Sequence, residues 1–89
     1  MSITHAEFLR SLQPLRQHYR YRLEEGGKRI VISDRRLSVE ISLGAEGESE
    51  LGALKMPSTR VALIFRGSDS SEMERFRSRF DLCFRRGGG

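Results

Sequence analysis

The chain has a single cysteine and no long apolar run, and each shortage excludes a class of protein. One cysteine cannot form an internal disulfide framework. No apolar segment approaches the roughly 18 to 20 residues that a membrane helix needs. The first residues lack the basic start and the apolar stretch of a secretory signal. We therefore expect a cytoplasmic protein without a membrane segment.

Lysine is also scarce, because arginine supplies nearly all of the 16 basic residues behind the net charge of +4. The planar guanidinium group suits phosphate and carboxylate, so an anionic partner is one interpretation of this bias. An arginine-rich genome is the other. The acidic residues are spread along the chain, and 89 residues with 37% apolar content suffice for one core. We expect a single domain over residues 1–89.

The N-terminal residues carry the signal of a helix start. Thr4 fits the N-cap position, and Glu7, three residues later, completes a capping box. Pro14 removes a backbone donor and disfavours helical geometry at the residue before it. These features predict a helix over about residues 5–13 with a stop or kink at the proline.

From Tyr19 onward apolar residues alternate with charged ones, as in a half-buried strand. Gly26-Gly27 predicts a first hairpin turn that pairs Leu23 with Ile30. Asp34-Arg35 predicts a second turn, which would pair Ile30 with Val39. The same registers place an arginine between two glutamates on the opposite side, as a charge ladder of Glu24, Arg29 and Glu40.

The third part of the sheet breaks this alternation. Residues 44–48 are acidic and contain two glycines, which predicts a loop, and Pro57-Ser58 predicts the turn of a third hairpin. That turn would put Leu54 on the same face as Val61. In all, the sequence predicts four or five strands, over about 19–25, 28–33, 36–43, 50–56 and 59–66.

A second amphipathic helix is predicted over about residues 70–86, with Gly87–Gly89 as a frayed tail that ends it. The order of elements predicts an α+β fold in which both helices pack on one face of an antiparallel sheet. The face they cover would carry Tyr19, Tyr21, Leu23, Ile30, Ile32, Leu37, Val39, Ile41, Val61, Leu63 and Phe65.

The other face is predicted to be uncovered, with an apolar strip among arginines. An apolar strip surrounded by charge is typical of a protein interaction surface. We expect association with a protein partner, most simply a second copy of the chain, since one patch then serves both subunits. The alternative is that the first helix or the acidic loop folds over this strip. The candidate interface residues are Val31, Leu51, Ala53, Ala62 and Ile64.

Arginines around that strip make nucleic acid or phosphate the alternative ligand. Sheet-based single-strand binders stack bases on exposed aromatic rings, whereas the predicted register sends the aromatic residues to the covered face. The candidate anion contacts are Arg20, Arg22, Arg29, Arg60 and Arg66.

No residue pattern indicates catalysis or a metal. Cys83 falls in the apolar stripe of the second helix, where core packing explains it better than reactivity does. His5 and His18 have no companion at metal-ligand spacing. We expect a non-enzymatic domain without cofactor or metal.

Overall fold

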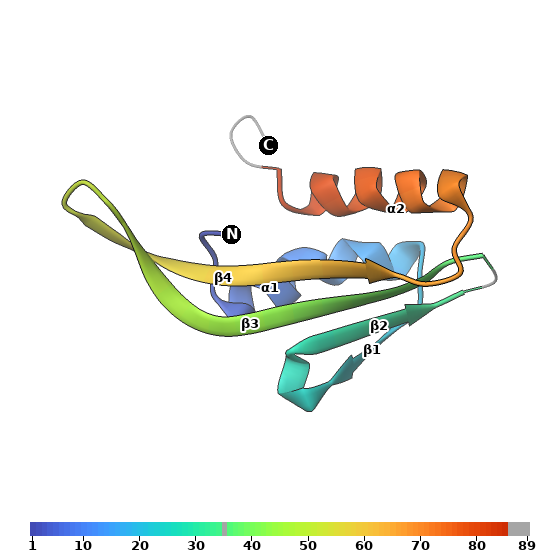
Figure 1. Ribbon diagram of the computed structural model, residues 1–89, viewed down its shortest axis with the longest axis horizontal. Helices are drawn as coiled ribbons and strands as arrows, with labels where there is room; N and C mark the ends of the chain where they lie inside the picture. The colour runs from blue at the N-terminus through green and yellow to red at the C-terminus, as the bar shows by residue number, and fades with distance from the viewer. Residues whose placement is uncertain (35, 86–89) are drawn as a thin grey trace.

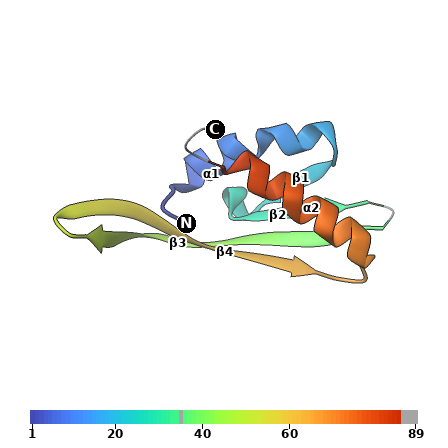
Figure 2. The same cartoon turned by 90° about the horizontal axis from the view of Figure 1, so that it is seen from above.

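The structure of the chain is a computed structural model that describes residues 1–34 and 36–85, apart from the side chains of Ser49 and Leu51. Four antiparallel strands form one sheet in the order β1-β2-β3-β4. Both helices lie on the same side of the sheet (Figures 1 and 2). The predicted α+β class is confirmed, with four strands. The elements are α1 (His5–Leu12), the 3-10 helix η1 (Gln13–Gln17), β1 (Tyr21–Glu24), η2 (Glu25–Gly27), β2 (Arg29–Ser33), β3 (Ser38–Leu51), β4 (Leu54–Phe65) and α2 (Ser70–Cys83).

Helix α1 begins and ends as the sequence predicts. The Thr4 side chain accepts a hydrogen bond from the Glu7 amide, and the Glu7 carboxylate accepts one from the Thr4 amide. The α-helix stops at Leu12, and the chain tightens into η1, which contains Pro14 near its start. Phe8 and Leu12 are fully buried, so this short helix fixes one side of the core.

The first hairpin has the predicted register, with Leu23 opposite Ile30. The second is shifted by two residues, so that Ile30 lies opposite Ile41 instead of Val39. The shift arises because Asp34 and Leu37 form a hydrogen-bonded pair, which moves the turn one residue further along the chain. Since side chains alternate with a period of two, every residue keeps its predicted face.

The third hairpin differs most from the prediction. Residues 44–48 belong to β3, and β4 runs through Pro57 and Ser58 without turning. The turn lies at Gly52 and Ala53 instead, where Gly52 has a φ of 63°. A β-bulge between Leu43 and Glu46 takes up one extra residue of β3.

Pro57 is accommodated because β4 is an edge strand. The peptide groups of Thr59 bond to Met1 on the outer side of β4, and the nitrogen of Pro57, two residues earlier, faces the same side. No ladder hydrogen bond is therefore lost at the proline. Leu54 now shares a face with Ala62 and Ile64, not with Val61, and its side chain is 64% exposed.

The core lies between the sheet and the two helices. Phe76 contacts Phe65 of β4 with ring centroids 5.9 Å apart, and Phe84 stacks on Phe8 at 4.8 Å. This stacking accompanies a departure from helical geometry at Phe84, so α2 ends at Cys83, earlier than predicted. Leu23, expected in the core, is 46% exposed. Arg86 and the predicted tail at 87–89 lie outside the described residues. The buried apolar residues are Ile3, Phe8, Leu12, Leu15, Tyr19, Ile30, Ile32, Leu37, Val39, Ile41, Leu43, Phe76 and Phe80.

Candidate functional site

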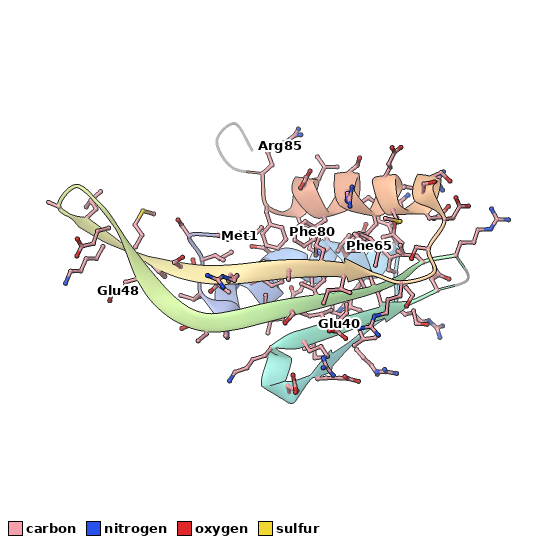
Figure 3. All side chains as sticks on the ribbon, viewed as in Figure 1. Met1, Glu40, Glu48, Phe65, Phe80 and Arg85 are labelled. Carbon is pink, nitrogen blue, oxygen red and sulfur yellow. The ribbon has the colours of Figure 1, made fainter. Side chains whose placement is uncertain are left out.

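No element of the described residues covers the side of the sheet opposite the helices (Figures 1 and 2), and we call this side the open face. Its central row crosses all four strands, because Arg22 lies opposite Val31, Val31 opposite Glu40, and Glu40 opposite Ile64. Figure 3 shows Glu40 on the strands away from the helices. The next row along the strands contains Glu24, Arg29, Ser42 and Ala62.

The structure brings together three of the five candidate interface residues. Val31 and Ile64 are half-buried on either side of Glu40, and Ala62 is exposed one step along β4. Ala53 does not join them, because it lies in the turn at the far end of the hairpin. The side chain of Leu51 is outside the described residues, although its backbone pairs with Leu54 beside that turn. The predicted strip fails there because the chain does not turn at residues 57 and 58.

Arg29 makes both ion pairs of the predicted charge ladder, but it lies opposite Ser42 and reaches Glu40 diagonally because of the register shift. Its guanidinium nitrogens lie 3.4 Å from a Glu24 oxygen and 3.6 Å from a Glu40 oxygen, with Glu25 at 3.9 Å. The charges of Glu40 and Glu25 and the hydrogen bond to Glu24 raise the pKa of Arg29 above its ordinary value. Since this network is exposed to solvent, each pair is worth little.

The five candidate anion contacts fall into two groups. Arg29 has the carboxylate partners just described, and Arg22 lies 3.2 Å from Glu24. Arg20, Arg60 and Arg66 are exposed, and in the described part of the chain no carboxylate lies within ion-pair distance of them. Arg20 precedes β1 and lines a hollow with Arg16 and His18, so it does not join the open face. The open face keeps a small excess of positive charge, with Arg22, Arg29, Arg60 and Arg66 against Glu24, Glu25 and Glu40.

The β3–β4 hairpin continues past the body of the molecule, and we call residues 46–58 the arm. Figures 1 and 2 show the arm projecting beyond both helices. Nearly all of its described side chains are exposed. It carries three glutamates, Glu46, Glu48 and Glu50, against Lys55, so its charge is opposite to that of the open face. Figure 3 marks Glu48 on this part of the hairpin.

The arm is missing from the sequence prediction, where residues 44–48 formed a loop. One usable signal was Gly52, a glycine between apolar residues that fits a turn as well as Pro57-Ser58 does. Choosing that turn would have paired residues 46–51 with 54–59. The prediction gave the proline more weight than its position on an edge strand justified.

The N-terminal residues clamp the base of the arm. The amide of Thr59 donates to the Met1 carbonyl oxygen at 2.8 Å, and the Met1 amino group donates back to the Thr59 carbonyl oxygen at 2.8 Å. The buried Thr59 hydroxyl donates to the Ile3 carbonyl oxygen at 2.7 Å. The His5 amide donates to Glu46 at 2.7 Å. The direction of the arm is therefore fixed where it leaves the body.

The outer edge of β4 is occupied at one point by the N-terminus. The amide of Arg66 bonds to Ser38, so alternate peptide groups of β4, including that of Leu63, face away from β3. Met1 occupies this edge at Thr59. Helix α2 lies along the rest of it in Figure 1 and crosses it in Figure 2, with Arg77 over the Phe65 ring. The N-terminus therefore blocks the addition of another strand at Thr59.

Catalytic and metal chemistry find no support in the described residues. No group of three histidine, cysteine or acidic side chains among residues 1–34 and 36–85 could hold a metal ion. Burial raises the pKa of the Cys83 thiol, which disfavours the reactive thiolate. In the same part of the chain, no helix is long and apolar enough to cross a membrane. Comparison of the chain with protein-family models, curated proteins and solved structures found no match.

Proposed function

We propose that the protein is a non-enzymatic, self-associating domain in which the open face and the arm bind a second copy of the chain. The observation that carries this proposal is the uncovered side of the β3–β4 hairpin. In β4 this side runs from Ile64 and Ala62 in the body to Met56 and Leu54 in the arm. A two-stranded hairpin on its own is marginally stable in water, so an arm of this length is expected to gain from a partner.

Net charge favours a second copy as that partner through long-range attraction. The arm has an excess of glutamate and the open face an excess of arginine. Glu46, Glu48 and Glu50 pair with Thr59, Pro57 and Lys55, so they lie on the side of the arm away from Met56 and Leu54. In a two-fold arrangement with the strands of the two copies antiparallel, each arm lies across the open face of the other copy. The contact between the arm of one copy and the open face of the other then occurs twice, as in an isologous dimer. Opposite charges also steer such surfaces together.

Sedimentation equilibrium at protein concentrations up to the high micromolar range tests this proposal. We expect a dimer for the natural sequence and a monomer for Ile64→Glu and for Leu54→Glu, which place charge on the uncovered side. Leu82→Glu is the matched control, because Leu82 is 59% exposed on α2, away from the open face. A strictly monomeric natural protein would overturn the proposal, and so would equal loss of association in the Leu82 control.

Nucleic acid is the competing ligand of the open face, because Arg60 and Arg66 have no carboxylate partner among the described residues. The aromatic residues of the sheet do not support it, since Tyr19 and Phe65 pack on the helix side. If nucleic acid binds here, the affinity for a mixed-sequence RNA should fall steeply with salt and should require Arg60 and Arg66. That result, with a monomeric protein, would replace the proposal.

A further inference from the structure

Two arginines from distant parts of the chain are held on neighbouring tyrosine rings on the helix side of the molecule. The guanidinium carbon of Arg16, in η1, lies 4.5 Å from the centre of the Tyr21 ring. That of Arg79, in α2, lies 5.5 Å from the centre of the Tyr19 ring, and its Nη1 donates to the Tyr19 hydroxyl at 3.2 Å. Tyr19 is buried. Stacking on an aromatic ring orients a guanidinium group while leaving most of its N–H donors free to bind a ligand.

Two adjoining hollows lie beside these arginines, and Gln17 and His18 line both. One, of about 260 Å³, lies between η1 and α2 and has apolar walls from Leu15 and Leu82, with Arg79 at its side. The other, of about 370 Å³, is more polar and is lined by Arg16 and Arg20 among others. We call the two hollows together the His18 site.

The arginines that line the His18 site have no acidic partner in the part of the chain that the structure describes. In the described residues, no carboxylate lies within ion-pair distance of Arg16, Arg20 or Arg79, whereas Arg36 and Arg75 both have one. Asp34 is the acidic residue among those lining the two hollows. The site therefore has an excess of oriented, unneutralised donors.

We propose that the His18 site binds a phosphate ester with a compact apolar group. Arginine forks match the oxygens of a phosphate, and charge-assisted hydrogen bonds of this kind are among the strongest in proteins. The polar hollow suits the phosphate, and the walls formed by Leu15 and Leu82 suit the organic part. The site lies on the helix side of the sheet, so this inference is independent of self-association through the open face.

The test is a titration with phenyl phosphate, followed by the amide chemical shifts of the full chain. Arg16→Gln and Arg79→Gln should each weaken binding about ten-fold or more, as expected for a lost charge-assisted hydrogen bond. Arg75→Gln is the matched control, because Arg75 is one turn earlier in α2 and already bonds Glu72 at 3.1 Å. Since Arg79 also contacts buried Tyr19, a thermal melt should establish that each variant folds, and Arg16→Gln tests the site without touching Tyr19.

Three further measurements identify the ligand. Inorganic phosphate should bind at the same amides more weakly than phenyl phosphate, because it lacks the apolar group. A single-stranded RNA that binds more tightly than phenyl phosphate, with the same dependence on Arg16 and Arg79, would identify a nucleic-acid backbone as the source of the phosphate. Binding should persist in the Ile64→Glu variant. The proposal is overturned if phenyl phosphate shifts no amide around His18 at low salt, or if Arg75→Gln weakens binding as much as Arg79→Gln.

Discussion

The body and the arm are built from the same two strands, yet different interactions hold them. In the body, Val39, Ile41 and Leu43 of β3 are buried beneath the helices. Beyond the bulge, Glu46, Glu48 and Glu50 continue the strand with no apolar core beneath them. The comparison shows that ladder hydrogen bonds and a clamp at the base can extend a hairpin beyond its core. It also shows where stability and binding are expected to separate.

The largest expected difference is in unfolding free energy. Phe76→Ala removes a fully buried ring that contacts Tyr19, Phe65 and Phe80, and should destabilise the protein by about 3–5 kcal/mol. Leu54→Ala in the arm should change the unfolding free energy by less than about 0.5 kcal/mol. Urea unfolding in the monomeric Ile64→Glu background measures both without a contribution from association. Similar losses for the two variants would mean that the arm belongs to the cooperative core.

Thr59 lies where the arm meets the body. Its hydroxyl should contribute more to the unfolding free energy than its methyl group does. Thr59→Val leaves the buried Ile3 carbonyl oxygen without this donor, so we expect a loss of about 1–3 kcal/mol in urea unfolding. Thr59→Ser keeps the donor and serves as the control. A Val variant as stable as the natural protein would show that the Thr59 hydroxyl contributes nothing to the clamp at the base of the arm.

Charge reversal in the arm should have a smaller free-energy effect than the Thr59 substitution. It should change the affinity of the dimer and leave the unfolding free energy unchanged. The double variant Glu48→Lys and Glu50→Lys reverses the net charge of the arm, and it leaves unchanged the side of the arm that carries Met56 and Leu54. Because these charges act across solvent and not in direct pairs, the dimer should weaken by up to about ten-fold, and added salt should reduce the difference. Sedimentation at two salt concentrations checks this. Reversal of Glu72 and Glu74 in α2 is the control, and equal weakening there would point to net charge alone.

The smallest expected effect concerns thiol chemistry. Cys83 is partly buried and its pKa is raised by burial, so it should react with iodoacetamide more slowly than a cysteine introduced at exposed Ala53 in a Cys83→Ser background. As the pH rises, the unfolded chain loses the thiol proton first. The natural protein should therefore lose a little stability as the pH rises above the ordinary thiol value of about 8.5, and Cys83→Ala should not. Faster reaction at Cys83 than at the arm would contradict this burial.

Local signals predicted the parts of the fold that depend on nearby residues. The capping box at Thr4, the break at Pro14 and the first hairpin at Gly26-Gly27 each rest on contacts within a few residues, and the structure has all three. The third hairpin could not be predicted in this way. A proline is a strong turn signal unless its strand lies at an edge, and strand order is a property of the whole sheet.

The same limit explains the outcome for the candidate site. Alternation placed Arg22, Arg29 and Ile64 on one face correctly, because a register shift of two preserves the face. Leu54 and Ala53 were misplaced because their positions depended on the wrong turn. The stacking of Arg16 and Arg79 on tyrosines joins residues from η1 and α2 to the start of the sheet, and no sequence spacing indicates it.

Hydrogen exchange at two protein concentrations tests most directly whether the arm is completed by a second copy. The account predicts that amides of the arm such as Gly47 exchange quickly in dilute protein and slowly in concentrated protein. Amides of the body such as Ile41 should exchange slowly in both. Arm amides that exchange at the same rate at every concentration, over the range up to high micromolar, would contradict the account.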